Sequence, residues 1–569
     1  ISLEGKKISV ILREHTINGS GLWDSLKAQG KELLAGPMRW ELVVDGKLQK
    51  WNTASPVLQT VDGGYAATGN AEIKSDSGIV LNSKIKFEYD SFFWSDTTLK
   101  NTEGKVVNRL TLVIPLNDAE MPLFHVISNT IRSNPGGRIP AGEGEVWNGA
   151  ELKRSGNSIH PQLVPHIWLG GVERGLTWFT DSSYGYRLRK DRGSLRLNRK
   201  NGILYMEVDI INRPVSLKDA HTFSFGMQAT PVKPMEKIWS RQTYDTTGVG
   251  VKGMQNVQCL NESILGFPLQ WAKVPEGEDY SLLHSMAEAS RSGKQINAME
   301  EQRKFRSKYD HITLRKIDKT PKTSSWDGVK HFSSVRDNFV KICMNNPART
   351  PSLPYKYSDP RLIYIQDEVP QYFKSEWWIS NTNYFGAWRS YPVPSNLDYM
   401  IYGYYNEIKH GMHGVYLDDV FLMPNTNTDT VARTDDEGEK HSQIGILALR
   451  ELIKRIAVIQ HQFGRYPRVL QVHMTNAQLI PCFAFATSQL AWESMFGETP
   501  FPERYTLDNV QAEGIGLRLG VDSVALGGIL RKTTARKDWP AKKAHPLPMP
   551  TKRPAATRCS SRPSRWSLM

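Results

Sequence analysis

The hydrophobic pattern of this chain changes near Thr230, and that change limits most strongly what the chain can fold into. Before it, short apolar runs alternate with turn signals, as where Ile85 and Phe87 alternate with polar neighbours, which is typical of half-buried strands. After Pro231 and Pro234, helix-length segments alternate with single strands. A chain of 569 residues also exceeds what one hydrophobic core usually serves. We therefore predict an N-terminal β-sandwich domain over 1–235 and a (β/α) domain over 236–530.

The first part of the chain is expected to be all β. Met38 to Val44 is followed by Asp45-Gly46, a dipeptide suited to a tight hairpin turn. Further strands are expected at Leu110 to Leu116, at Leu176 to Phe179 and at Ile203 to Ile211. Frequent strands with few helical stretches favour a sandwich of two sheets.

The second part alternates helices with strands. Apolar residues recur every three or four positions from Ile446 to Ile459, which predicts an amphipathic helix ended by Gly464 and Pro467. A (β/α)8-like TIM barrel fits this alternation, and a barrel truncated at its C-terminus is the alternative form. The other expected elements are helices at Ser281 to Ser292, at Asn396 to His410 and through Ile480, and strands at Gln295 to Met299, Leu362 to Gln366, Val415 to Leu417, Val469 to His473 and Ser488 to Trp492.

Three of these strands end in polar residues. One ends in Asp418-Asp419, one at His473 with Asn476 just beyond it, and one at Glu493. Catalytic groups of such barrels lie at the carboxyl ends of the strands. Hydrolysis of a glycosidic bond needs one group to protonate the leaving oxygen and another to stabilise charge at the anomeric carbon, which two carboxylates can supply. A strand-terminal Asp can equally cap a helix or bind a loop amide.

Aromatic residues are dense between residues 376 and 404. Trp378 and Trp388 are the preferred candidates for stacking on a sugar ring, with Tyr384 beside them in the sequence, and Tyr416 lies on the strand that ends at Leu417. Core packing between helices and strands accounts for many of the other aromatics, and for Trp147, Trp168 and Trp178 in the first part.

The net charge of +14 is concentrated at the C-terminus. Residues 531–569 hold 11 Lys and Arg against one acid, which leaves 61 Lys and Arg against 57 Asp and Glu in the rest of the chain. This proline-containing tail has no apolar period, so we expect it to be disordered, or to be the product of a shifted reading frame. It lacks interleaved aromatics, and we expect no nucleic-acid partner.

Other function classes find little support in the sequence. Four widely spaced cysteines, without a Cys-x-x-Cys pair, indicate neither a disulfide framework nor a metal site. We expect no metal, no cofactor and no membrane span. Because the chain begins at Ile1 without a leader-like segment, we expect a processed form or a fragment.

Several segments together resemble glycoside hydrolase family 123-like proteins, whose known members include β-N-acetylgalactosaminidases. The resemblance runs from about residue 20 to about residue 530. The segments that carry it are Val164 to Gly170 with Glu173 to Leu176, Gly226 to Pro234, Gly414 to Asp419 and His473 to Asn476.

The resemblance implies an adjacent Asp-Glu pair in which Asp orients the 2-acetamido group of the substrate and Glu is the acid/base. Here the pair is Asp-Asp. By position Asp418 would be the orienting residue and Asp419 the acid/base, unless Glu493 supplies the acid or the sugar lacks an acetamide. The resemblance also implies a bacterial protein that is secreted or periplasmic. The alternative is a non-catalytic carbohydrate-binding or structural barrel protein, or an inactive fragment, and the oligomeric state stays open.

Overall fold

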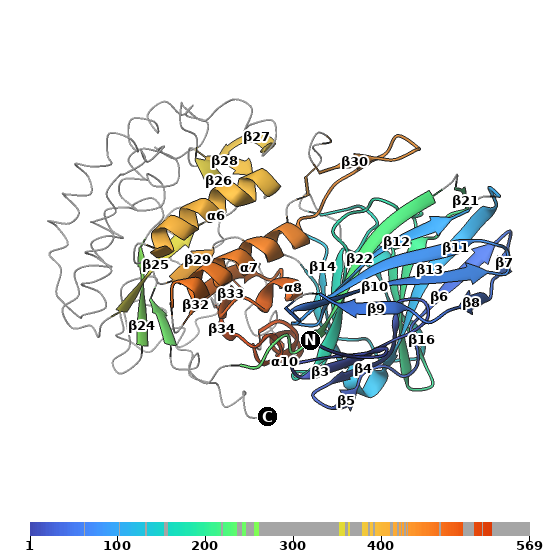
Figure 1. Ribbon diagram of the computed structural model, residues 1–569, viewed down its shortest axis with the longest axis horizontal. Helices are drawn as coiled ribbons and strands as arrows, with labels where there is room; N and C mark the ends of the chain where they lie inside the picture. Colours follow the sequence, from blue (N-terminus) through green and yellow to red (C-terminus); the bar gives the residue numbers. More distant parts are fainter. Residues whose placement is uncertain are drawn as a thin grey trace, which may run out of the picture.

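The computed structural model describes residues 1–235 apart from a few loop positions, six strands between 242 and 390, and residues 393–525 with gaps that include 410–413, 418–419 and 493–505. The helix expected at Ser281 to Ser292, the strand expected at Gln295 to Met299 and the tail 531–569 lie outside the described residues. Figure 1 shows a β-rich part, coloured blue to green, beside a part in which helices accompany a parallel sheet.

The first of two large antiparallel sheets has ten strands. Neighbouring strands follow one another in the order β15-β14-β17-β18-β22-β12-β11-β10-β8, and β9 also pairs with β10. Their bounds are β15 (Gly136–Arg138), β14 (Leu123–Ile127), β17 (His166–Gly170), β18 (Gly175–Phe179), β22 (Ala220–Thr230), β12 (Phe92–Lys100), β11 (Val80–Glu88), β10 (Ala66–Ser75), β9 (Val57–Thr60) and β8 (Trp51–Thr53).

The second large sheet has seven strands in the order β16-β19-β20-β13-β6-β7, with β21 paired to β13. Their bounds are β16 (Gly144–Asn148), β19 (Leu195–Lys200), β20 (Ile203–Ile211), β13 (Val106–Asn117), β6 (Arg39–Val44), β7 (Lys47–Leu48) and β21 (Val215–Ser216). A smaller antiparallel sheet joins β1 (Ser2–Glu4), β2 (Lys7–Val10), β3 (Arg13–Ile17), β4 (Trp23–Ala28) and β5 (Lys31–Glu32) in sequence order.

The two large sheets pack face to face as a sandwich. The ring of Trp40 on β6 lies edge-on to Phe223 and Phe225 of β22, with ring centroids 5.7 and 5.9 Å apart. The strands expected in this region are confirmed, and the turn between β6 and β7 has positive φ at both Asp45 (49°) and Gly46 (77°). This is the backbone geometry that a two-residue hairpin requires.

The second part is built on a parallel sheet of seven described strands in the order β23-β24-β25-β29-β32-β33-β34. Their bounds are β23 (Gln242–Asp245), β24 (Gln255–Leu260), β25 (Ser352–Ser358), β29 (Gly414–Leu417), β32 (Val469–Thr475), β33 (Ser488–Ala491) and β34 (Asp522–Ala525). Helix α6 (Pro394–Lys409) leads into β29, α7 (Ile446–Gln462) connects β29 to β32, and α8 (Ile480–Phe483) precedes β33.

Helix α7 confirms the expected amphipathic helix. Its buried residues include Ile446, Leu449, Ile453, Ile456 and Ile459, which are the apolar positions of the stripe. The strand expected at Leu362 to Gln366 is present as β26 (Leu362–Tyr364), but it belongs to a separate antiparallel sheet with β28 (Ala387–Ser390) and β27 (Trp378–Tyr384). A single apolar run does not specify its pairing partner, which is why the sequence pattern placed it in the (β/α) alternation.

The sandwich supplies the N-terminal cap of α7. Gly445, the residue before the helix, has no side chain that could accept a hydrogen bond. Instead the carboxylate of Asp181, just beyond β18, accepts the backbone N–H groups of Gly445 at 2.8 Å and Ile446 at 2.5 Å, and the side-chain amide of Gln443 at 2.8 Å. Burial raises the pKa of Asp181 to about 6, although these hydrogen bonds oppose the rise. A carboxylate at a helix N-terminus also complements the helix dipole.

A buried ion cluster links α7 to the sandwich a turn further along. The guanidinium of Arg450 donates to Glu88 at 2.7 Å and to both oxygens of Asp90 at 2.8 and 2.9 Å, and it lies 4.1 Å from the ring centre of Phe92. Burial alone would raise the pKa of Glu88, but the charge of Arg450 and the bond from Lys86 hold it at about 2. Buried ion pairs therefore join the two parts of the chain.

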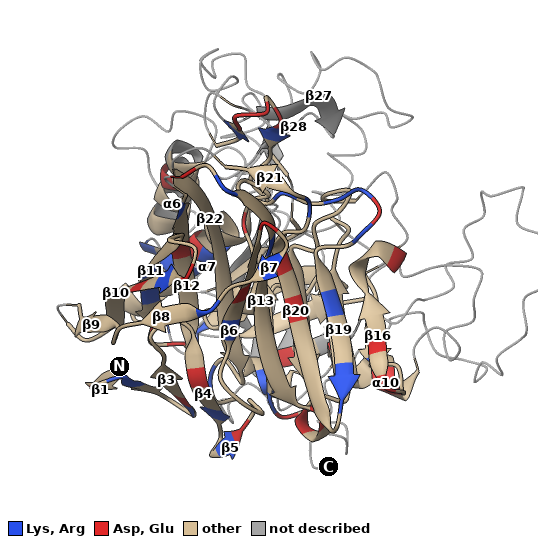
Figure 2. Cartoon of the chain, turned by 90° about the vertical axis from the view of Figure 1, so that its right-hand side faces the viewer, with Lys and Arg blue, Asp and Glu red and all other residues tan. Residues whose placement is uncertain are grey.

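Charged residues on the outer sandwich strands have mixed signs. Figure 2 shows Asp and Glu on β20 and β16, with Lys and Arg on β19, the strand between them. Among the described helices, none is long and apolar enough to cross a membrane.

Candidate functional site

The carboxyl edge of the parallel sheet is the place where the sequence predicts catalysis. Asp418 and Asp419 themselves lie outside the described residues, but the chain is described on both sides of them. Leu417 pairs with Val472 on β32, and the N–H of Val420 donates to the carbonyl of His473 at 2.8 Å. The two residues that flank the Asp-Asp pair therefore both lie against β32.

Tyr416 and His473 lie together on the neighbouring strands β29 and β32, although β32 continues to Thr475 and does not end at His473 as expected. The Tyr416 hydroxyl and His473 Nδ1 are 3.1 Å apart, and their rings are nearly parallel with centroids separated by 6.3 Å. Both residues are buried. A hydroxyl held on one ring nitrogen fixes the orientation of an imidazole, which is what a positioned active-site histidine requires.

The next strand, β33, ends in an unusual backbone conformation. Trp492 directly follows β33 and has φ of 66°, in the left-handed region that L-residues with side chains rarely adopt. Such conformations persist only where the surrounding structure enforces them, and they cluster at functional sites. Glu493, the third predicted carboxylate, is the next residue and lies outside the described residues.

Asn476, predicted to contact the substrate, is buried between the two parts of the protein. Its Oδ1 accepts the N–H of Asn134 at 3.0 Å, and its Nδ2 donates to the Asn134 carbonyl at 2.9 Å and to Glu513 at 3.0 Å. The described contacts of this amide are thus made with the protein itself.

The three aromatic residues predicted to stack on sugar belong to the small antiparallel sheet. Trp378 and Tyr384 are the ends of β27, and Trp388 on β28 pairs with Asn383 and Ile363. Their side chains lie outside the described part of the structure, so the stacking role stays a prediction.

A row of polar side chains crosses the parallel sheet, and sequence analysis did not anticipate it. Tyr416, Gln471, Ser488 and Asp522 lie directly opposite one another on β29, β32, β33 and β34, and all four are buried. Residues in register on adjacent parallel strands share one face of the sheet. In the described structure, Gln471 Oε1, Ser488 Oγ and Asp522 Oδ2 have no hydrogen-bond partner. The sheet therefore carries uncompensated polarity on this face.

The carboxyl group of Asp522 makes this row sensitive to pH. Burial raises the pKa of Asp522 from 3.8 to about 6. When folding raises the pKa of a carboxyl, its neutral form favours the folded state. This contribution to stability is complete at a pH below the pKa in the unfolded chain, and it is lost as the pH rises through the pKa in the folded protein.

We therefore expect Asp522→Asn to raise the free energy of unfolding by roughly 1–3 kcal/mol at pH 7.5 relative to the wild type, with little difference at pH 4. Urea unfolding at the two pH values measures the effect. Asp24→Asn, at an exposed position on β4, is the control and should change neither value. An equal change at both pH values would contradict the assignment.

A second cluster, Ser183, His441 and Asp435, has the residue types of a Ser-His-Asp catalytic triad, but its contacts are those of a structural attachment. Ser183 Oγ lies 2.9 Å from His441 Nδ1, and His441 Nε2 lies 2.9 Å from Asp435 on the hairpin of β30 (Arg433–Thr434) and β31 (Lys440–His441). Ser183 is buried, and Arg187 pairs with Asp435 at 3.2 Å. Oxygen and nitrogen atoms of Asp435, Glu439 and His441 also lie within 4.8 Å of one another, a spacing that could hold a metal ion. Because Arg187 already compensates Asp435, the cluster is suited to fasten the hairpin to the sandwich.

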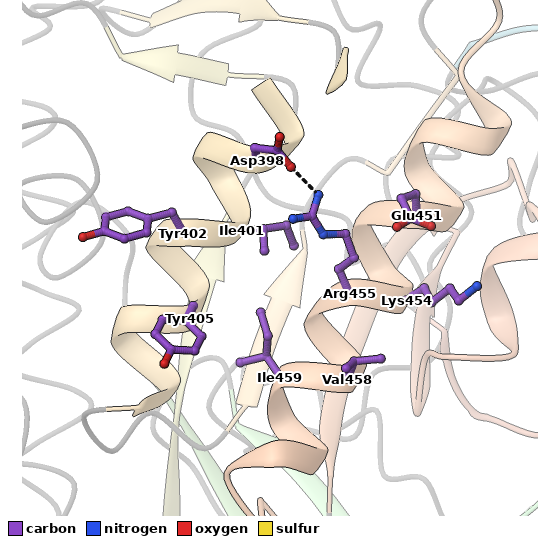
Figure 3. Close-up of a pocket in the computed structure, with 9 residues that line it drawn as sticks. All are labelled: Asp398, Ile401, Tyr402, Tyr405, Glu451, Lys454, Arg455, Val458 and Ile459. Carbon is purple, nitrogen blue, oxygen red and sulfur yellow. Dashed lines mark hydrogen bonds and ion pairs between the residues drawn. The ribbon is translucent and has the colours of Figure 1, made fainter. Parts of the chain in front are cut away.

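The described residues also form a groove of about 530 Å³ between α6 and α7. Figure 3 shows Ile401 on α6 and Ile459 on α7 pointing into the space between the helices, with Arg455 and Asp398 joined across it, while Tyr402 points away from α7. That ion pair is 2.7 Å long. The groove lies between two helices rather than at the carboxyl ends of the strands, so we do not assign it to the chemistry predicted from the sequence.

Comparison with known families identifies the N-terminal part. Residues 1–231 match the family model described as the third domain of glycoside hydrolase 123. The resemblance noted in the sequence is thereby confirmed for the sandwich, which is less than half of the 569 residues. No curated protein matches the chain.

Solved structures of glycosidases give distant matches. The family 36 α-galactosidase AgaB from Geobacillus stearothermophilus is 11% identical with a TM-score of 0.33, over 79% of this chain and 63% of that one, so the chain spans less than two thirds of AgaB. A raffinose complex of a variant of AgaA from the same organism is 11% identical with a TM-score of 0.36, over 86% of this chain and 75% of that one. The α-N-acetylgalactosaminidase NagBb from Bifidobacterium bifidum, bound to GalNAc, is 9% identical with a TM-score of 0.30, over 87% of this chain and 81% of that one. Similarity at this level assigns neither a fold nor a substrate.

Proposed function

We propose that this chain, whose residues 1–231 form a domain of glycoside hydrolase family 123, is a glycosidase that cleaves its substrate at the carboxyl edge of the parallel sheet. The observation that supports the proposal is the placement of Leu417 and Val420, which flank Asp418 and Asp419 in the sequence, against Val472 and His473 of β32. The left-handed backbone of Trp492, immediately before Glu493, gives independent support, because strain of this kind accompanies functional sites.

The architecture in this proposal is a sandwich over 1–235 followed by a (β/α)8 barrel over 236–530 and a disordered basic tail over 531–569. The seven described parallel strands, with α6 and α7 beside them, support a barrel. A barrel directs its catalytic groups into the space above the carboxyl ends of its strands. We further propose, from the family resemblance, that the protein is bacterial and is either secreted or periplasmic.

The substrate in this proposal is a glycan with a β-linked N-acetylhexosamine. The carbonyl oxygen of the 2-acetamido group attacks the anomeric carbon while the acid protonates the departing glycosidic oxygen, so that one C–O bond forms as the other breaks. Water then opens the cyclic oxazolinium intermediate, and the same residue takes a proton from that water. Asp418 would orient the acetamide, and either Asp419 or Glu493 would be the acid/base.

Hydrolysis of a panel of 4-nitrophenyl glycosides tests this function. The panel includes the β-N-acetylgalactosaminide, the β-N-acetylglucosaminide, and the α- and β-galactosides. We expect release from an acetamido sugar and competitive inhibition by the thiazoline that mimics its oxazolinium intermediate. Release only from sugars without an acetamide would retain the hydrolase and refute acetamide participation. Failure of the folded protein to cleave any glycan, together with binding of one, would favour the non-catalytic alternative.

A further inference from the structure

A buried carboxylate ties together the carboxyl ends of β32 and β33. Glu513 lies in the short helical segment η4 (Val510–Gly514) and is 3% exposed. Its Oε2 accepts the side-chain N–H of Asn476 at 3.0 Å and the indole N–H of Trp492 at 3.1 Å. Asn476 directly follows β32 and Trp492 directly follows β33. One oxygen atom thus connects the ends of two neighbouring parallel strands.

Residues of the sandwich also bind Asn476, the residue that joins β32 to Glu513. The side-chain amide of Asn476 and the backbone of Asn134 exchange two hydrogen bonds, and the Asn476 carbonyl lies 3.1 Å from His125 Nε2 on β14. Gly136 on β15 allows Glu513 to approach, since a Cβ atom there would lie 2.6 Å from Glu513 Oε1. The edge of the sandwich formed by β14 and β15 is therefore shaped around this carboxylate.

The same contacts stabilise the left-handed conformation of Trp492. A non-glycine residue in this region costs on the order of 1–3 kcal/mol, so it needs external support. The bond from the indole to Glu513 supplies one constraint. Gly514 supplies another, because a Cβ atom on it would lie 2.7 Å from the Trp492 ring. Rotation of Trp492 would redirect the chain at the end of β33.

We propose that Glu513 and Asn476 are positioning residues through which the family 123 domain fixes the carboxyl edge of the sheet. This inference rests on the proposed function, because the edge is where Asp418, Asp419 and Glu493 would act. It gives Asn476 a role different from the sugar contact predicted from its sequence position. Enzymes depend on such support because a misplacement of about 1 Å can cost about 100-fold in rate.

The test breaks the bond between Asn476 and Glu513 and then restores a bond between these two positions. Asn476→Asp keeps the acceptor for the Asn134 N–H, but it loses the donor to the Asn134 carbonyl and replaces the donor to Glu513 with a carboxylate, so that two carboxylates face each other at about 3 Å. In the double variant Asn476→Asp/Glu513→Gln, the glutamine amide can donate to the new carboxylate. Because Asn476 and Trp492 share one oxygen of Glu513 in the wild type, the amide group must turn for its oxygen to accept the Trp492 indole N–H. Glu513→Gln alone keeps an acceptor for both donors and is the matched control.

On the acetamido substrate we expect Asn476→Asp to lower kcat by about 30-fold or more with KM within about threefold, and the double variant to recover to within about fivefold of the wild type. Glu513→Gln alone should change kcat by less than about fivefold. A purely structural role would lower the thermal midpoint without this split between kcat and KM, and the second substitution would not restore kcat. That result would overturn the proposal.

A measurement that needs no substrate tests the positioning role independently of the proposed glycosidase activity. Amide hydrogen exchange in the peptide that covers residues 488–492 should accelerate in Asn476→Asp and slow again in the double variant, while the peptide 203–211 on β20 stays unchanged. If the wild type cleaves nothing, this pattern still supports the positioning, and unchanged exchange overturns it. If Asn476→Asp does not fold, Trp492→Phe removes the indole donor together with part of the ring that packs against Gly514, and it should give the same direction of change in exchange and in kcat.

Discussion

Asp418→Asn and Asp419→Asn are each expected to lower kcat on the acetamido substrate by about 10³-fold or more, because general acid/base groups and the groups that orient an internal nucleophile contribute effects of this order. The two variants should differ in their dependence on the leaving group. A nitrophenolate departs without help from an acid, whereas an alkoxide of a natural glycan requires protonation. The variant that lacks the acid should therefore retain far more activity on the nitrophenyl glycoside than on an unactivated disaccharide.

The same measurement decides which carboxylate is the acid. If Asp419 is the acid, Asp419→Asn shows the dependence on the leaving group and Glu493→Gln does not. The reverse result assigns the acid to Glu493. Asp398→Asn is the control, since Asp398 is exposed on α6 and pairs with Arg455, and it should leave kcat within about twofold. Full activity in both Asp418→Asn and Asp419→Asn would remove the Asp-Asp pair from the mechanism.

The second large effect is expected on stability. Arg450→Met should lower the free energy of unfolding by about 3–5 kcal/mol, because it removes the cation paired with the buried carboxylate of Asp90, while Glu88 keeps its pairs with Lys86 and Lys454. Arg455→Met is the matched control five residues along the same helix. Its pair with Asp398 is largely exposed, and its loss should cost about 0–1 kcal/mol.

The pH dependence sharpens this expectation. The folded pKa of Glu88 is about 2, below its ordinary value of 4.5, so the wild-type ion cluster contributes stability that is present above pH 4.5 and lost as the pH falls towards 2. Arg450→Met should therefore differ most from the wild type near neutral pH and least near pH 2. Chemical denaturation at several pH values measures the difference. A loss below 1 kcal/mol at pH 7 would show that the interface tolerates these charges without Arg450.

Much of the fold follows from local patterns in the sequence. The strand expected at Ile203 to Ile211 has the bounds of β20, and the apolar stripe from Ile446 to Ile459 lies within α7. These elements are recognisable because many residues repeat one period. The partners of β26 could not be predicted in the same way, because an apolar run of three to five residues is compatible with either a parallel or an antiparallel neighbour.

The strands around the proposed site could be predicted from the sequence, and the contacts between their side chains could not. The sequence places Tyr416 and His473 near the ends of consecutive strands, and the structure brings their side chains together. Glu513 gave no signal, because it is a single acid in a segment without period, and Asn134 lies more than 340 residues before its partner Asn476. The polar row could have been noticed, since Gln471 is a polar residue between the apolar residues Leu470 and Val472 of β32.

The cap that Asp181 provides for α7 has a consequence for how the protein is made. The acceptor and the first helical N–H are 265 residues apart, and the acceptor is synthesised first. Domains generally fold as units from the N-terminus during synthesis. We therefore expect the sandwich, with Asp181 in position, to be folded before α7 is synthesised. The folded sandwich then acts as a template for the later half of the chain. Expressed separately, the later half would begin folding without that template.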